Sequence, residues 1–293
     1  MQGGLVDIGL PAALFLIMIG MGLTLTPKDF REVLIAPKAT FFGLFAQVLI
    51  VPLAAFALAW LMQLDPLLAV GLVIIAACPG GTTSNIFTYL GGGDVALSVV
   101  LTVLASLVAI VTLPLFTGLA LDAFQDASVA IQLPVGRTII SLIVIVIVPL
   151  LIGMSLRKWT PVFAARAERF VGAFGMTVLV LVIVAILLSL GDRVVTLARD
   201  GTYIAVALNI IGIAIGLGGG RLLGLDLKQS FTIAVELGLK NATLGLMITL
   251  TLLHSNEMSV PSAVYGMVMF VLGGLLVMFS RQMGLARPPI AGE

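Results

Sequence analysis

Long apolar runs without charge recur along the whole chain, and they limit it to one kind of fold. Of its 293 residues, 60% are hydrophobic and 10% are charged, whereas a soluble domain has about 25% charged residues. A helix needs about 20 consecutive apolar residues to cross a bilayer. We therefore predict an all-α integral membrane protein that lies in a lipid bilayer, with no separate soluble domain.

Nine segments have the length and apolarity of membrane-spanning helices. The third is interrupted at Pro79-Gly80-Gly81, because proline removes a backbone donor and glycine disfavours a helix. The eighth is interrupted around Gly238 to Asn241. The nine predicted spans lie near residues 5–25, 39–63, 66–90, 95–121, 133–156, 170–191, 202–224, 229–253 and 259–280.

The basic residues predict the orientation, because cytoplasmic loops carry an excess of Lys and Arg. With the N-terminus outside, the inner loops hold eleven basic residues and the outer loops three, while Lys240 falls within a span. We therefore predict a multi-pass protein of the inner (plasma) membrane with a cytoplasmic C-terminus. The inner residues are Lys28, Arg31, Lys38, Arg157, Lys158, Arg166, Arg169, Arg221, Lys228, Arg281 and Arg287, and the outer ones are Arg137, Arg193 and Arg199.

The two interrupted spans hold corresponding positions in the two halves of the chain. Each is the second-last span of its half, and spans 1 to 4 run opposite to spans 6 to 9. This layout is typical of an inverted repeat. Two interrupted helices in corresponding positions indicate the binding site of a secondary transporter.

Glu236 is the only acidic residue that we place deep in a predicted span, and Lys240 follows it by four residues. A buried carboxylate costs about 3 kcal/mol even on the mildest insertion scale, so it normally has a partner or lines a cavity. One interpretation is that the two residues neutralise each other across a helical turn. The other is that Glu236 belongs to a functional site.

Hard oxygen ligands follow the first interruption. Hydroxyls, an amide carbonyl and a carboxylate suit a small hard cation and suit a soft metal poorly. The alternative is that small polar residues merely let helices pack closely. The residues with such oxygens are Thr82, Thr83, Ser84, Asn85, Ser98 and Thr102.

Each interruption also starts a new half-helix, whose first amides have positive dipole character. This favours an anionic substrate near Gly81–Thr83 and Asn241–Thr243.

Three stretches of the sequence, GMGLTLTPKDF, ACPGGTTSNIFTYLGGGDVALSV and ELGLKN, resemble the bile acid:sodium symporter family. The resemblance covers essentially the whole chain and is to the nine-span form. It implies one transmembrane domain, 1–293, in which two interrupted helices cross. The panel domain would hold the spans near 5–25, 133–156 and 170–191, and the core domain those near 39–121 and 202–280.

The resemblance also implies the ion sites. A second sodium in the family is held by residues that match Gln47, Glu236, the carbonyls of Leu237 and Leu239, and a glutamine replaced here by Lys240. Lysine offers donors and no acceptor, so its ammonium would stand in for that ion by reaching Glu236 and Gln47, and one sodium is expected. The first sodium would be held by Ser84, Asn85, Ser98, Thr102 and Glu236.

The predicted function is therefore sodium-coupled symport of a small organic anion by alternating access of core against panel. The alternative is a proton-coupled or uncoupled organic anion transporter in which Lys240 replaces the second sodium. The resemblance adds two apolar positions to the substrate site, which favour a less polar substrate. The predicted substrate-binding residues are Thr82, Thr83, Asn241, Met269 and Phe270.

Other classes of function fit the sequence less well. A net charge of +1 argues against a nucleic-acid partner. An enzyme needs a nucleophile with a base or a metal cage, and the chain has one cysteine, Cys78, one histidine, His254, and one acid deep in a span. A channel is a further alternative, and nothing in the sequence indicates an obligate protein partner.

Overall fold

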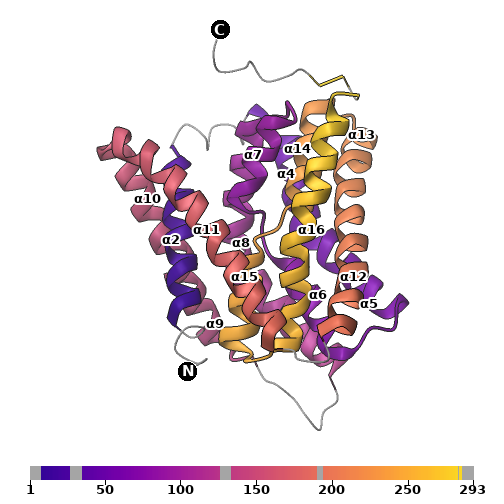
Figure 1. Cartoon of the computed structure of the whole chain (residues 1–293). Helices are drawn as coiled ribbons and strands as arrows, with labels where there is room; N and C mark the ends of the chain where they lie inside the picture. Colours follow the sequence, from indigo (N-terminus) through magenta and orange to yellow (C-terminus); the bar gives the residue numbers. More distant parts are fainter. Residues whose placement is uncertain (1–7, 27–34, 126–132, 190–193, 283, 286–293) are drawn as a thin grey trace.

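The computed structural model describes residues 8–26, 35–125, 133–189, 194–282 and 284–285. Nearly all of these residues are helical, and the long helices run roughly parallel or antiparallel to one direction (Figure 1). The described residues contain no β-sheet, only one isolated bridge between Gly80 and Lys240. Four of the basic residues used to predict the orientation lie outside the described residues: Lys28, Arg31, Arg193 and Arg287.

The first half of the chain forms helices that begin at the predicted positions to within a few residues. Proline stands in the first turn of α2 and at the start of α4 and α6, where its missing donor costs nothing. The bounds are α2 Leu10–Thr24, α4 Pro37–Phe45, the π-helical segment η3 Ala46–Ile50, α5 Val51–Leu61, α6 Pro66–Ala77, α7 Thr82–Leu90 and α8 Val95–Phe124. Because α4, η3 and α5 are continuous, they form one long helix.

The second half follows the same pattern, with π-helical segments that join shorter helices into longer ones. The bounds are α9 Val135–Leu142, η5 Ile143–Ile147, α10 Val148–Trp159, α11 Pro161–Ser189, α12 Val194–Ala214, η7 Ile215–Gly219, α13 Gly220–Leu222, α14 Leu227–Gly238, α15 Ala242–Met247, η8 Ile248–Leu252 and α16 Asn256–Ser280. Helix α11 begins well before the span predicted near 170–191, because Pro161 starts a helix that continues into the apolar segment.

Five of the described helices are long and apolar enough to cross a membrane: Pro37–Leu61, Val95–Phe124, Val135–Trp159, Val195–Leu222 and Asn256–Ser280. Shorter apolar helices are Leu10–Thr24, Pro66–Ala77, Ala173–Ile186 and Ala242–Leu252. An all-α integral membrane protein is therefore the architecture that these helices support. The number of nine spans stays a prediction.

The two predicted interruptions are confirmed, and they lie against each other. Helix α6 ends at Ala77 and α7 begins at Thr82, while α14 ends at Gly238 and α15 begins at Ala242. The amide of Asn241 donates to the carbonyl of Pro79 at 2.8 Å, and that of Gly81 donates to Leu239 at 3.3 Å. Main-chain hydrogen bonds thus join the two breaks, which we call the crossing segments, Cys78–Gly81 and Leu239–Asn241.

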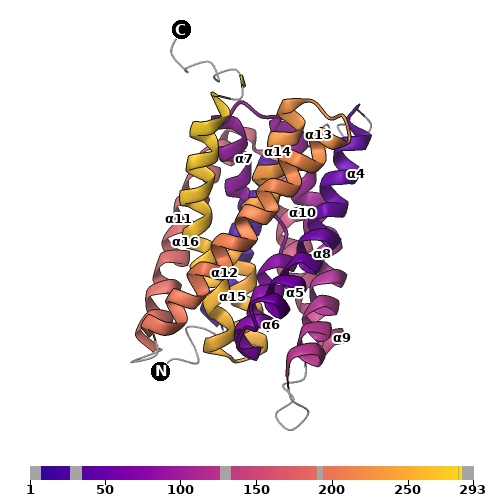
Figure 2. The ribbon, with the colours of Figure 1, turned by 90° about the vertical axis from the view of Figure 1, so that its right-hand side faces the viewer.

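Helices α2, α10 and α11 lie side by side on the left of Figure 1. Gly22 of α2 and Gly153 of α10 bring the two backbones into direct contact, since a Cβ on Gly22 would lie 2.8 Å from the Cα of Gly153. On the other side of the molecule, α12 packs against α14 and α16 (Figure 2).

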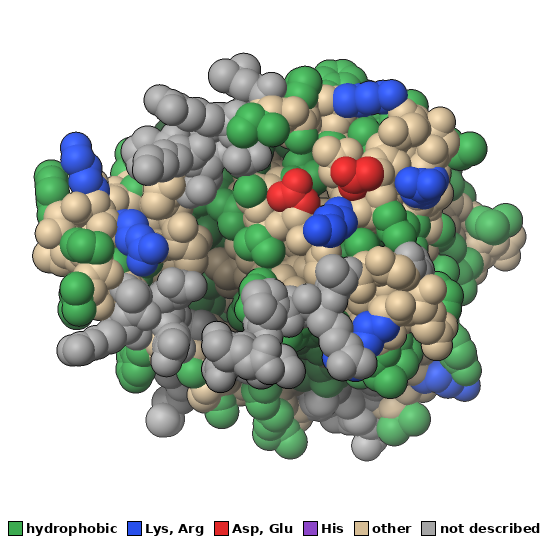
Figure 3. All heavy atoms as spheres, turned by 90° about the horizontal axis from the view of Figure 1, so that it is seen from above, with side chains coloured by type: hydrophobic (Ala, Val, Ile, Leu, Met, Phe, Trp, Pro, Cys, Tyr) green, Lys and Arg blue, Asp and Glu red, His purple; other side chains and the backbone are tan. Residues whose placement is uncertain are grey.

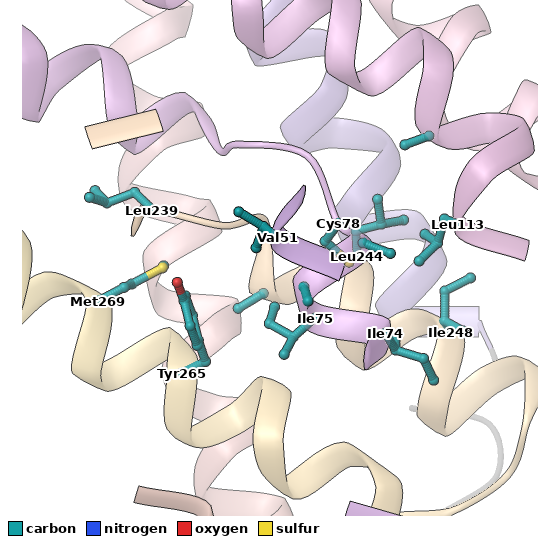
Figure 4. Close-up of a cluster of buried hydrophobic side chains, with 14 of the residues drawn as sticks. Val51, Ile74, Ile75, Cys78, Leu113, Leu239, Leu244, Ile248, Tyr265 and Met269 are labelled. Carbon is teal, nitrogen blue, oxygen red and sulfur yellow. The ribbon is translucent and has the colours of Figure 1, made fainter. Parts of the chain in front are cut away.

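A cluster of buried apolar side chains surrounds the crossing segments (Figure 4). Cys78 and Leu239, one from each segment, are fully buried within it. Val51 approaches from α5, and Tyr265 and Met269 approach from α16. The crossing segments are therefore enclosed by the core, which leaves their backbone groups to be satisfied by protein partners.

Candidate functional site

Glu236 forms the centre of a buried polar network next to the crossing segments. Its side chain is 1% exposed. Ser84 Oγ donates to Glu236 Oε2 at 2.6 Å, Thr102 Oγ1 donates to Oε1 at 2.7 Å, and Ser98 Oγ donates to Oε2 at 3.4 Å. Helices α7, α8 and α14, far apart in sequence, therefore bring their polar side chains to one carboxylate.

Asn85 completes this network. Its Oδ1 lies 2.9 Å from Ser98 Oγ, whose single proton is shared between Asn85 and Glu236. The Ser84 and Thr102 hydroxyl oxygens lie 3.4 Å apart. The structure thus brings together all five residues that the sequence analysis assigned to the first sodium. Each hydroxyl that donates to the carboxylate keeps lone pairs, so the set offers oxygen ligands to a hard cation.

Gly80 makes room for this carboxylate. A Cβ at Gly80 would overlap the carboxylate of Glu236. The first crossing segment therefore needs glycine at this position for space, because Glu236 lies directly against its backbone.

Lys240 does not lie where the sequence analysis placed it. It belongs to the second crossing segment, outside α14, and no ion pair within 4.0 Å joins the two described residues Lys240 and Glu236. Its Nζ donates instead to the carbonyl of Ala76 at 3.1 Å, and its side chain is fully buried. The interpretation of a helical-turn ion pair is therefore wrong, since α14 ends at Gly238, before Lys240, and the ammonium donates to α6 instead.

Gln47 bonds to the same end of α6 as Lys240, without a hydrogen bond between the two side chains. Its Nε2 donates to the carbonyl of Cys78 at 2.7 Å, while its Oε1 is buried without a hydrogen-bond partner among the described residues. The carbonyls of Ala76 and Cys78 mark the C-terminal end of α6, where carbonyls lack helical partners and carry negative dipole character. Lys240 and Gln47 therefore cap the end of one half-helix.

One cavity of about 640 Å³ extends from the crossing segments towards the ends of α2 and α10. All five predicted substrate-binding residues line it: Thr82, Thr83, Asn241, Met269 and Phe270. Phe270 also packs on Phe87, with ring centroids 6.1 Å apart. The remaining wall is mostly apolar and includes Ile17, Ile86, Val99 and Leu179.

The amides predicted to face an anion are only partly available. Gly81 and Asn241 use theirs to join the crossing segments, and Ala242 donates to the carbonyl of Lys240. Asn241 Oδ1 caps α15 by accepting from the amide of Leu244 at 3.0 Å. Three cavity-lining residues keep amides that donate to no other described group: Thr82, Thr83 and Thr243.

Two side chains that were not predicted from the sequence form a clamp on the last carbonyl of α14. Asn209 Nδ2 donates to Gly238 O at 2.7 Å, and Tyr265 Oη donates to the same oxygen at 2.9 Å. An asparagine within an apolar span and a tyrosine in the middle of the last span were the available signals. The clamp fixes the half-helix that carries Glu236 two residues earlier.

This arrangement suits binding rather than bond-breaking chemistry. A hard-oxygen cluster surrounds Glu236 next to the crossing segments, and a cavity lined by amides that donate to no other described group begins at the same segments, with Asn85 belonging to both. A cation and an anion would therefore bind next to the same two segments.

Comparison with known proteins agrees with this geometry. The family model described as the sodium bile acid symporter family matches residues 11–197. The probable sodium/metabolite cotransporter BASS1, chloroplastic, of Arabidopsis thaliana is 33% identical over 264 residues, which cover 88% of this chain and 63% of that protein.

Two further relatives come from bacteria and vertebrates. The sodium-dependent transporter YocS of Bacillus subtilis is 32% identical over 90% of this chain and 80% of its own length. The human ileal sodium/bile acid cotransporter is 30% identical over 79% of this chain and 66% of its own length. These names describe transporters, which agrees with the prediction that the chain is not an enzyme. Because the family model matches more than half of its residues, the chain belongs to the sodium bile acid symporter family.

Proposed function

We propose that the protein is a secondary active transporter that couples sodium to the movement of a small organic anion. The observation that carries the proposal is the convergence of Ser84, Ser98 and Thr102 on the buried carboxylate of Glu236. With Asn85, these residues would hold one sodium ion. A carboxylate balances the charge of the ion, and the neutral oxygens replace part of its hydration shell.

The substrate would occupy the cavity beside the crossing segments. Its anionic group would accept hydrogen bonds from the amides and hydroxyls of Thr82 and Thr83, near Asn241, and its apolar part would contact Met269 and Phe270. Helix N-termini favour anions in this way. The relatives named as sodium/bile acid and sodium/metabolite cotransporters support this substrate class.

Coupling would follow from the shared crossing segments. Glu236 lies against Gly80, whereas the anion site begins at Gly81 and Thr82. A bound sodium would hold the first crossing segment in the geometry that the anion needs. By linkage, the anion would raise the affinity for sodium by the same factor.

The larger architecture is part of the same proposal. Nine spans would form an inverted repeat, with α2, α9 to α10 and α11 as the panel and the remaining helices as the core. The core would move against the panel to expose the cavity to either side. The basic residues support an N-terminus outside the cell and a cytoplasmic C-terminus.

A second candidate is a transporter driven by protons or by no ion. The observation that favours it is Lys240, a fully buried cationic side chain next to the crossing segments. Either Lys240 or Glu236 would then exchange a proton during the cycle. Uptake that follows a pH gradient and persists without sodium would support this candidate.

Replacement of Glu236 by glutamine tests the sodium proposal. The variant keeps the shape of the side chain but removes the charge that balances the ion, so sodium should no longer raise the melting temperature of the purified protein. The parent should be stabilised as the sodium concentration rises above its dissociation constant. Potassium serves as the control for ionic strength, and Ser106→Ala, whose hydroxyl bonds only to the carbonyl of Thr102, serves as the matched variant. An unchanged sodium titration in Glu236→Gln would remove Glu236 from the ion site.

A further inference from the structure

Arg157 lines the same cavity as the proposed anion site, although the sequence assigns it only a topological role. It stands in the last turn of α10, and its side chain is half-buried. Thr24, at the end of α2, lines the same part of the cavity. Seen from this end of the molecule, basic side chains lie at the left edge, where α10 ends, and the acidic side chains in view lie near the middle of the face beside other basic side chains (Figure 3).

The close contact of α2 and α10 explains why Arg157 faces the cavity. Gly153 touches the backbone of α2 at Ile19 and Gly22. Residues four apart share one face of a helix, so Arg157 continues the face of α10 that is turned towards α2. Lys158, one position further, is exposed and is not among the cavity-lining residues.

The charge of Arg157 is not neutralised locally. It makes no ion pair or hydrogen bond with another described residue, and no carboxylate is among the described residues that line the cavity. A guanidinium stays charged at every physiological pH and matches a carboxylate or sulfonate in geometry. Charge at the mouth of a low-dielectric cavity raises the local concentration of the opposite charge.

We propose that Arg157 binds the organic anion at the mouth of the cavity, on the predicted cytoplasmic side, along the path between the amides of Thr82 and Thr83 and the cytoplasm. This inference rests on the proposed transport of organic anions and adds a specificity-determining residue to it. The competing explanation is that Arg157, like Lys158, only complements the end of a helix and the membrane topology.

A reporter cysteine at Thr24 measures the effect of Arg157 without any knowledge of the substrate. The only native cysteine, Cys78, is fully buried. In detergent-solubilised Thr24→Cys protein, we would compare the rates of reaction with two methanethiosulfonates of similar size, the anionic sulfonatoethyl reagent and the cationic trimethylammonioethyl reagent. The anionic reagent is itself an organic sulfonate, so its rate reports how readily such an anion enters.

We expect Arg157→Gln to lower the ratio of the anionic to the cationic rate about fivefold, the effect of one charge roughly 8 Å away in water. Arg157→Lys should keep most of the ratio, and Lys158→Gln should change it by less than about twofold, since an exposed charge is screened. In the parent, added salt should reduce the ratio.

Equal ratios in Arg157→Gln and Lys158→Gln, both eluting as monodisperse protein, would overturn the proposal. The measurement needs neither sodium nor transport, so its failure would leave the Glu236 test unaffected.

Discussion

At the residue scale, hydroxyl groups donate hydrogen bonds to the carboxylate of Glu236 and stabilise its buried charge. Among the described residues, Glu236 is the only fully buried acid. Removing a charge from water is costly unless hydrogen bonds or counter-charges compensate. Ser84, Ser98 and Thr102 supply those hydrogen bonds, so the carboxylate is stabilised without a direct ion pair to Lys240 among the described residues.

Gly80→Ala tests the space that this carboxylate occupies. The added methyl group would overlap the Glu236 side chain, so the carboxylate must move and the hydroxyl network must rearrange. We expect a sodium affinity at least about tenfold lower and a loss of stability of about 1–3 kcal/mol, as in overpacked cores. Thermal unfolding at increasing sodium concentration measures both. Gly118→Ala, where a Cβ would meet nothing within 4 Å, is the matched control, and equal behaviour of the two variants would contradict the close packing.

Thr82→Val with Thr83→Val tests the anion site. Valine keeps the volume and the backbone amides but removes both hydroxyls, so substrate affinity should fall by about 1 kcal/mol per lost hydrogen bond. Sodium affinity should change less, since neither hydroxyl bonds to Glu236 in the described structure. A thermal-shift screen of organic acids, followed by titration of a hit into both proteins, provides the measurement. Equal affinities would place the substrate elsewhere.

At the scale of elements, the half-helix α14 is fixed at its last carbonyl. Asn209 from α12 and Tyr265 from α16 both donate to Gly238 O. The free carbonyls at the end of a helix require such partners when they are buried. The clamp therefore links two neighbouring helices to the element that carries Glu236.

Tyr265→Phe removes one of these two donors and leaves the ring in place. We expect the free energy of unfolding to fall by about 1–2 kcal/mol and the sodium affinity to fall, because the end of α14 becomes less constrained. Tyr203→Phe, at an exposed position of α12, controls for the loss of a hydroxyl. If stability falls while the sodium titration is unchanged, then the clamp supports the fold and not the ion site.

Residue type explains which parts of these elements were predictable. Proline and glycine mark the breaks at Pro79 and Gly238, and the apolar runs mark the helices. The pairing of the crossing segments was implied only by the family resemblance, because main-chain hydrogen bonds leave no mark on the sequence. The partner of Lys240, the carbonyl of Ala76, was hidden for the same reason.

The site residues also divide into those that the sequence predicted and those that it could not predict. The oxygen ligands near Glu236 were identified by type and spacing and by resemblance, whereas Gly80, Asn209 and Tyr265 act through space and backbone contacts. Arg157 and Lys158 are equivalent in sequence and differ only in the direction that each side chain takes from α10. Such directions depend on which face of a helix its neighbours cover.

At the scale of the whole molecule, we expect the number of ions per cycle to depend on Lys240. Its ammonium caps the end of α6 at the carbonyl of Ala76, and Gln47 caps the same end at the carbonyl of Cys78, with its Oε1 unpaired among the described residues. The family resemblance implies a glutamine and a second sodium at this position. A permanent cation there would hold the crossing segments without an ion that arrives and leaves.

Lys240→Gln should therefore increase the sodium requirement. The variant gains a carbonyl oxygen and loses the competing charge, so the Hill coefficient of sodium-dependent uptake should move from about one towards two. Lys240→Met, which removes the charge but adds no oxygen, should stay near one. Uptake into proteoliposomes under a sodium gradient, a proton gradient or neither separates the possibilities. A parent that already carries two sodium ions would contradict the built-in cation.

The contact between Gly22 and Gly153 has a mechanical consequence. At this contact, backbone lies against backbone, so no side chain stands between α2 and α10 there whose rotamer could absorb a change in spacing. They should travel as one rigid body throughout the cycle. We then expect the interface that opens and closes to lie on the opposite side of the cavity, between the α2–α10 pair and the crossing segments.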